Sequence, residues 1–208
     1  MKNLFFIGAA LCMITCKQQS AKSELPVDIS VSDTILAKEK AIVIDSSKIK
    51  QLSKYFHFKK DEFDKEDLTW VIPKSAPKFV NRNGLYCCFT LKNNKPVQFV
   101  FSVQYLADDW LFIRNCDLLI DGKKFHLEPS EVKRDNGDGE IWEWFSERIF
   151  LTNHDFVDAL ASASKAKIKL NGDKYYESKE ISKSQILNIK RTLELYKAMG
   201  GDFTYSEI

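Results

Sequence analysis

The sequence lacks a charge excess of either sign. Lysine and arginine number 31 against 29 aspartate and glutamate residues, which gives a formal net charge of +2. Nucleic-acid-binding domains usually carry a clear basic excess or a basic stripe, because contacts with phosphates supply much of their affinity. We therefore expect no nucleic-acid partner and no strong electrostatic attraction to a membrane surface.

Familiar catalytic and metal-binding motifs are also missing. The three histidines, His57, His126 and His154, are scattered and show no zinc-ligand spacing. The acidic, glycine-rich stretch 135–140 fails as an EF-hand, because a non-ligand residue falls at the first ligand position in either register. No phosphate-cradling glycine loop and no nucleophile elbow is present. We therefore expect no metal, no cofactor and no catalysis.

Cysteine is scarce. Apart from Cys12 and Cys16 near the N-terminus, the chain has Cys87, Cys88 and Cys116. The adjacent pair would face opposite sides of a strand, so its members cannot readily bond to each other. One of them could meet Cys116 across a sheet in an oxidising compartment. An odd count favours the alternative, which is three small buried thiols.

No apolar run is long enough to span a bilayer, but a short one opens the chain. Residues 4–13 follow a positive leader and have the length of a signal-peptide core. The run ends in Met13-Ile14-Thr15-Cys16, which resembles a bacterial lipoprotein signal, where lipid is attached to the Cys and cleavage occurs just before it. This predicts a signal peptide over residues 1–15 and a stable lipid anchor on Cys16. An ordinary secretory signal is the alternative.

A polar segment follows the anchor. Residues 16–45 are rich in Ser, Lys, Glu and Asp, which predicts a flexible tether. Lys17-Gln18-Gln19 lacks the Asp that commonly retains a lipoprotein in the inner membrane. We expect the protein in the outer membrane, facing the periplasm, with the cell surface as the alternative. The membrane is then a partner through the lipid.

Residues 46–201 have the length and patterning of one globular domain, followed by a tail at 202–208. Its predicted centre is Val97 to Leu127, read as three antiparallel strands joined by two tight turns. Apolar residues alternate with polar ones in the first strand. The second is predicted from Trp110 to Ile120, and Asp121-Gly122 then supplies a hairpin turn.

The remaining pattern predicts further strands at 70–72, 85–91 and 140–145, and a lysine-guarded edge strand at 165–170. Two helices are expected near the C-terminus, one opening at Thr152 and one at the capping box Ser182 to Gln185. A short helix is expected from Ser46 to Phe56. The predicted fold class is α+β and mainly β, an antiparallel β-sandwich-like sheet with two C-terminal helices after a signal peptide and tether.

Four stretches resemble a domain found in secreted or lipid-anchored bacterial proteins, namely residues 75–84, 104–114, 141–144 and 174–176. The resemblance covers roughly residues 70–199. It implies a fold and a location in the cell envelope, and it implies no catalytic residues.

The expected function is that of a lipid-anchored envelope protein with a binding or structural domain. One alternative is carbohydrate binding by surface aromatics, with Trp110, Trp142, Trp144 and Tyr175 as candidate ligand-binding residues. Their competing role is to pack the sheets together. A second alternative is an envelope hydrolase, although Asp108-Asp109 has no partner that the sequence can place. A glycan or an envelope protein is the expected partner besides the membrane.

Overall fold

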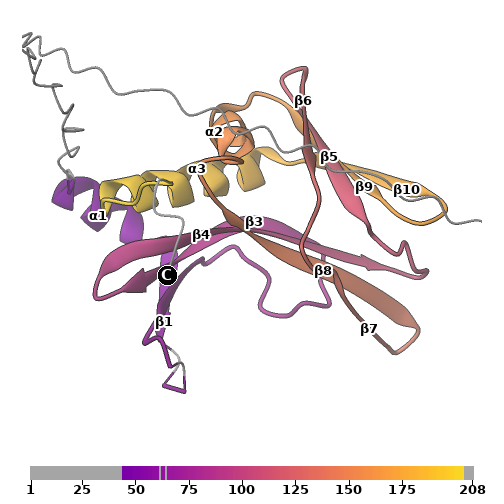
Figure 1. The fold of residues 1–208 in the computed structure, drawn as a ribbon, viewed down its shortest axis with the longest axis horizontal. Helices are drawn as coiled ribbons and strands as arrows, with labels where there is room; N and C mark the ends of the chain where they lie inside the picture. Colours follow the sequence, from indigo (N-terminus) through magenta and orange to yellow (C-terminus); the bar gives the residue numbers. More distant parts are fainter. Residues whose placement is uncertain (1–43, 61, 64, 204–208) are drawn as a thin grey trace, which may run out of the picture. The chain divides into compact units, whose positions relative to one another are not determined.

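The computed structural model describes residues 44–60, 62–63 and 65–203. The signal peptide, Cys16 and nearly all of the tether lie outside the described residues. Ala41–Ile208 is one compact unit, and its described part holds two antiparallel sheets and three helices (Figure 1). This confirms the predicted fold class.

The two sheets have six and four strands. The first has the order β1 (Phe56–Lys60), β2 (Thr69–Pro73), β3 (Gly84–Lys92), β4 (Lys95–Ala107), β8 (Glu140–Ile149), β7 (Lys133–Gly137). The second has the order β10 (Tyr176–Ile181), β9 (Ala166–Asn171), β5 (Asn115–Ile120), β6 (Lys123–Leu127). The helices are α1 (Ser46–Ser53), α2 (Asp155–Ser162) and α3 (Lys183–Ala198).

The core lies between one face of the six-stranded sheet and the layer formed by the helices and the second sheet. The predicted alternation in β4 is confirmed, since Phe99, Phe101 and Val103 are all buried. Tyr196 of α3 packs edge-on against Phe99, with 5.1 Å between ring centroids, and Phe156 of α2 packs against Phe101 in the same way. α2 and α3 therefore pack against the aromatic face of the six-stranded sheet.

The polar side of β4 is buried as well. Ser102 and Gln104 lie on the face opposite the aromatic residues, as the alternation predicts, yet they are only 3% and 7% exposed. β4 lies between β3 and β8, so both side chains are flanked by neighbours on the same face. Ser102 shares a hydrogen bond of 2.8 Å with Ser146 of β8, and Gln104 lies directly opposite Trp144.

The first predicted hairpin of the central stretch is wrong. β4 pairs with β3 and β8, and residues 108–114 carry the chain across to the other sheet, where β5 begins only at Asn115. The N–H groups of Leu111, Phe112 and Ile113 bind the carboxylate of Glu143 instead of a neighbouring strand. The second turn is confirmed, with φ angles of 46° and 88° at Asp121 and Gly122.

The prediction of a lysine-guarded edge strand at residues 165–170 is wrong. β9 pairs with β10 on one side and with β5 on the other. Its lysines alternate with buried Ala166, Ile168 and Leu170. Lys167 and Lys169 therefore project from the middle of a sheet and form part of its open face.

The helix starts were predicted with mixed success. Ser182 caps α3 and forms the expected capping box with Gln185. α2 begins at Asp155 and not at Thr152, because the Asn153 side chain accepts the Phe150 N–H and closes a turn before the helix. α1 ends at Ser53, so Phe56 opens β1 instead of completing a helical face.

Within the described part of the chain, no helix has the length and apolar character needed to cross a bilayer.

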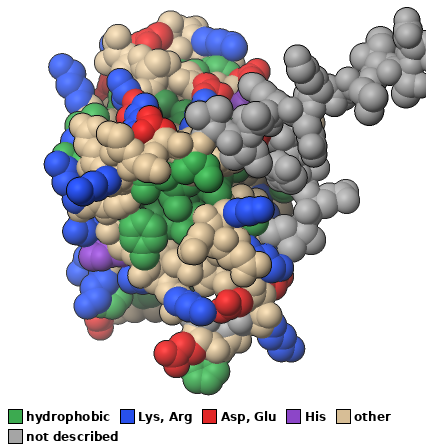
Figure 2. All heavy atoms as spheres, turned by 90° about the vertical axis from the view of Figure 1, so that its left-hand side faces the viewer, with side chains coloured by type: hydrophobic (Ala, Val, Ile, Leu, Met, Phe, Trp, Pro, Cys, Tyr) green, Lys and Arg blue, Asp and Glu red, His purple; other side chains and the backbone are tan. Residues whose placement is uncertain are grey.

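The face at the left of Figure 1 carries an area of hydrophobic side chains bordered by lysine and arginine (Figure 2). The four-stranded sheet lies toward the right of Figure 1, so this area is separate from the site described next.

Candidate functional site: the open face of the four-stranded sheet

The outer face of the four-stranded sheet is polar and open because its strands alternate strictly. In β5, Cys116, Leu118 and Ile120 point into the core, while Asp117 and Leu119 point outward. The same alternation in β9 turns its lysines outward. Residues from two separate segments of the chain, the β5–β6 hairpin and the β9–β10 hairpin, therefore meet on one surface.

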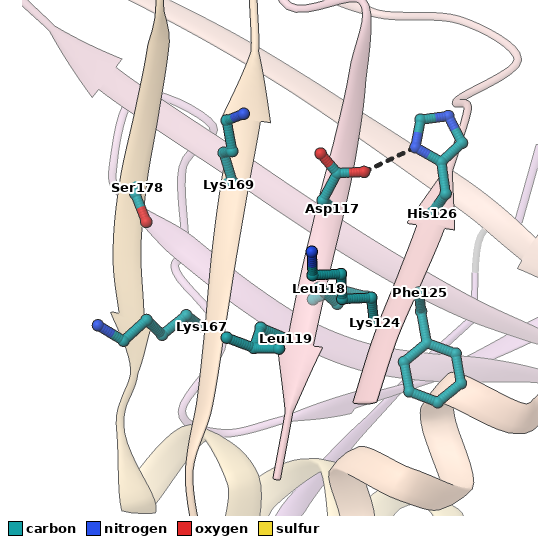
Figure 3. A pocket seen from close by; sticks show the side chains of 9 residues that line it. All are labelled: Asp117, Leu118, Leu119, Lys124, Phe125, His126, Lys167, Lys169 and Ser178. Carbon is teal, nitrogen blue, oxygen red and sulfur yellow. Dashed lines mark hydrogen bonds and ion pairs between the residues drawn. The ribbon is translucent and has the colours of Figure 1, made fainter. Parts of the chain in front are cut away.

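Strand register aligns these outward side chains in rows. One row crosses all four strands, and its members are Ser178, Lys169, Asp117 and His126. The next row consists of Glu180, Lys167, Leu119 and Lys124. Figure 3 shows seven of these eight residues, which line a shallow hollow of about 540 Å³ together with Leu118 and Phe125.

Asp117 and His126 form the tightest contact in the hollow. His126 Nδ1 lies 2.7 Å from Asp117 Oδ1 (Figure 3). Asn171 Nδ2 donates to Asp117 Oδ2 at 2.8 Å. These hydrogen bonds, first that of His126 and then that of Asn171, lower the pKa of Asp117, and the charge of Lys169 adds to the effect. An ionised carboxylate only accepts, so Nδ1 carries the proton and Nε2 is the acceptor of the neutral ring.

The three lysines of the hollow are held to different degrees. Lys167 Nζ forms an ion pair of 2.8 Å with Glu180, and Lys169 Nζ lies 4.3 Å from the centroid of the Tyr176 ring. For Lys124 the described residues supply no ion pair. Lys124 and Lys169 are therefore the lysines most free to contact a ligand.

The row contains the residue types of a Ser–His–Asp triad, but its geometry does not form one. Ser178 and His126 stand on the two outer strands of the sheet, three strand spacings or about 14 Å apart. A proton transfer from Ser178 to His126 would require hydrogen-bond distance. The arrangement is suited to binding a charged ligand through several side chains.

Two of the sequence-predicted aromatic residues lie elsewhere. Trp142 and Trp144 project from one face of β8, and Glu143 between them projects from the other face toward residues 111–113. Both indoles are partly exposed, and the Trp142 ring lies against Gly137 of β7.

Trp110 and Tyr175 form a second pair. The Tyr175 hydroxyl donates to the carbonyl oxygen of Trp110 at 2.5 Å, and the Trp110 ring stacks on Phe112 with 5.7 Å between centroids. Trp110 directly precedes the residues that Glu143 contacts, and Tyr175 is bonded to Trp110, so this pair lies on the opposite side of β8 from Trp142 and Trp144. The structure does not bring the four aromatic residues together on one surface.

The cysteines are all free and buried in the described part of the chain. Burial raises the pKa of Cys88 and of Cys116 to about 12 and holds that of Cys87 well above its usual value. Of the two alternatives, the structure supports buried thiols and shows no bond from Cys87 or Cys88 to Cys116. None of the three thiols has the electropositive, accessible setting of a reactive cysteine.

The residues of the open face were missed by sequence reasoning. The alternation of lysine with apolar residues at 165–170 predicts an edge strand, whereas β9 is paired on both sides. Nothing local indicates that Asp117 lies beside Lys169, because 52 residues separate them in the chain and only their pairing across β5 and β9 brings them together. The two strands of the β5–β6 hairpin could have been paired from its predicted turn, which places Asp117 opposite His126.

Comparison with known proteins found no matching family model, no matching curated protein and no matching solved structure.

Proposed function

We propose that this protein is a lipid-anchored envelope protein whose domain binds an anionic ligand on the open face of its four-stranded sheet. Cys16 carries the anchor and residues 16–45 act as the tether, in the outer membrane facing the periplasm. One observation carries the binding proposal. The hollow on the open face is lined by Lys124, Lys167, Lys169 and His126, and of its three lysines only Lys167 has a carboxylate partner, Glu180, among the described residues.

The physical argument is one of charge balance on a surface. Asp117 already accepts hydrogen bonds from His126 and Asn171, so both of its carboxylate oxygens have partners within the protein. The lysine ammonium groups are solvated hydrogen-bond donors, and the oxygens of a carboxylate, sulfate or phosphate group can accept hydrogen bonds from them. Leu119, which is 40% exposed, adds an apolar floor to the hollow. A polymer bearing several anionic groups can contact several of these side chains at once.

The binding proposal can be tested with two polymers that differ only in charge. The full-length protein in non-ionic detergent should bind dextran sulfate and not dextran, as measured by titration calorimetry. Affinity should fall as salt is added, because exposed charges are screened. The double variant Lys124→Ala, Lys169→Ala should bind at least about tenfold more weakly, since it loses two charge-assisted contacts.

A charge-matched control separates this site from general basicity. Lys50 and Lys74 are exposed on α1 and beyond β2, and the double variant Lys50→Ala, Lys74→Ala removes the same charge from the protein. It should bind dextran sulfate like the unmodified protein. The assignment to the open face would be refuted if both double variants bound dextran sulfate equally weakly, or if neither variant changed the affinity.

The uncharged polymer also tests the carbohydrate-binding alternative. Trp142 and Trp144 are partly exposed on the same face of β8, which is the observation that favours it. Saturable binding of dextran that is lost in Trp144→Ala and kept in the Lys124→Ala, Lys169→Ala variant would favour that function over ours.

The anchor has its own test. With radiolabelled palmitate, the unmodified protein should take up label and lose its signal peptide, whereas Cys16→Ser should remain unlabelled and unprocessed. Cys12→Ser is the matched control and should be labelled normally. Label that persists in Cys16→Ser would disprove lipidation at that residue without bearing on the binding site.

A further inference from the structure

A second cavity lies between the two sheets, on the other side of the four-stranded sheet from the hollow. It measures about 100 Å³ and opens at the edge formed by β10. Its apolar wall comes from both sheets and consists of Leu85, Val103, Ile168, Leu170 and Ile181, all buried. Its polar lining includes Asn83 and Lys179.

Lys179 reaches across this cavity from β10 to the six-stranded sheet. Its Nζ donates to Asn83 Oδ1 at 2.9 Å and lies 4.7 Å from the centroid of the Tyr105 ring. Asn83 is itself fixed, because its Oδ1 also accepts the Leu106 N–H at 3.2 Å. The lysine is thus held at the mouth of the cavity by neutral partners.

The ammonium group of Lys179 has no ion-pair partner among the described residues. Its side chain is partly buried, and this burial lowers its pKa while the charge of Glu177 acts in the opposite direction. An ammonium group has three donors, and Asn83 accepts one of them. A ligand carboxylate can accept a further one and form an ion pair with the ammonium group.

The first turn of α3 contributes Gln185 to the wall of the same cavity, and the positive end of a helix favours a nearby anion.

We propose that the inter-sheet cavity binds a short-chain aliphatic carboxylate, with the carboxylate on Lys179 and the hydrocarbon chain between Val103 and Ile168. The size agrees with this class, because a cavity of about 150 Å³ holds benzene and one of about 100 Å³ holds roughly four carbons. The site is separate from the open face, since Lys179 points inward from β10 whereas its neighbour Ser178 points outward.

The test uses methyl NMR on the full-length protein in non-ionic detergent, with butanoate as the probe. Ile168 and Ile181 line the cavity, and Ile149 of β8 does not. Butanoate should shift the methyl signals of the first two saturably and leave that of Ile149 in place. Butan-1-ol should bind about tenfold more weakly, because it lacks the charge that Lys179 recognises. Decanoate should gain nothing over butanoate, because its chain exceeds the cavity.

Variants separate a real site from non-specific partitioning. Lys179→Met should reduce butanoate affinity at least about tenfold and leave that of butan-1-ol unchanged. Lys169→Met is the matched control, because it removes a lysine from the opposite face of the same sheet, and it should bind butanoate normally. The proposal is overturned if butanoate gives no saturable shift, if butan-1-ol binds equally well, or if Lys179→Met binds butanoate like the unmodified protein.

Discussion

Glu143 is completely buried on β8, and its carboxylate accepts four hydrogen bonds. It accepts the N–H groups of Leu111, Phe112 and Ile113, each at 2.8 Å. Arg134 Nε adds a fourth bond at 3.0 Å, and the Arg134 guanidinium also donates to the Ile113 carbonyl. This single residue holds the segment that carries the chain from one sheet to the other.

We predict that Glu143→Gln destabilises the protein by about 2–4 kcal/mol. The amide keeps the shape, but it points an NH₂ group at N–H donors and leaves Arg134 without its charge partner. Urea unfolding followed by circular dichroism measures the change. Glu140→Gln, at the exposed start of β8, is the control and should change stability by less than about 0.5 kcal/mol. Similar values for both variants would contradict the role assigned to Glu143.

Asp117 gives a pH-dependent prediction. Its pKa lies below the usual 3.8 because His126 and Asn171 bond to its carboxylate. The folded chain therefore binds fewer protons than the unfolded chain, so this stabilisation is present above about pH 4 and is lost as pH falls through the folded pKa. The side chain is 42% exposed, so solvent screening limits the effect to about 1 kcal/mol or less.

Asp117→Asn should accordingly be less stable than the unmodified protein near pH 5, and the difference should shrink near pH 3. Urea unfolding at both pH values measures it. Asp138→Asn, in the exposed β7–β8 turn where a φ of 52° suits asparagine, is the control. A difference that stays constant with pH would show that Asp117 stabilises the fold by packing rather than by charge.

At the scale of elements, the turn between β9 and β10 is packed against the crossing segment 108–114. The Arg114 N–H donates to the Asn171 carbonyl at 2.8 Å, and the Asp173 N–H donates to the Leu111 carbonyl at 3.2 Å. A Cβ atom at Gly172 would collide with the Leu111 carbonyl oxygen. Glycine is required there because two backbones approach each other closely.

Gly172→Ala should therefore destabilise the protein by about 2–3 kcal/mol, since backbone must shift and the hydrogen bonds around it weaken. Thermal or urea unfolding measures this. Gly137→Ala is the matched control, because its added Cβ would meet only the Trp142 ring at 3.3 Å, and a change below about 1 kcal/mol is expected. If Gly172→Ala proves neutral, the turn does not pack on Leu111 in solution.

Elements were predicted well where the signal is local. The Ser182 to Gln185 capping box, the Asp121-Gly122 turn and the apolar alternation of β4 all follow from nearest neighbours, and the structure confirms each. Residues 110–113 are apolar and therefore favour a strand. The N–H groups of residues 111–113 instead donate to Glu143, about 30 residues away in the chain, and no local pattern reveals such a partner.

At the scale of the whole molecule, the burial of the three thiols depends on the packing of the entire core. Each is buried in the core, with Cys87 and Cys116 at 0% exposure and Cys88 at 4%. With pKa values of about 12 for Cys88 and Cys116, very little reactive thiolate exists in the folded protein.

We predict that all three thiols react with Ellman's reagent more than about 100-fold more slowly in the folded protein than in urea. The chain for this measurement carries Cys12→Ser and Cys16→Ser, so that only Cys87, Cys88 and Cys116 are counted. Three equivalents should appear in urea without reductant. Fewer than three would reveal a disulfide, and fast reaction without urea would show that the core opens readily.

The sequence alone was sufficient for features whose physics is local along the chain. The lipoprotein signal at Cys16 is still a prediction of this kind, and the mainly β composition, the C-terminal helices and the buried thiols are confirmed ones. The partners of each strand depended on long-range contacts. β9 became an inner strand because β5 and β10 both pair with it, and this pairing gathers Asp117, His126 and Lys169 on one open face. Side-chain alternation says which residues share a face of one strand, whereas the candidate site needed the register among four strands, which is set by how the whole core packs.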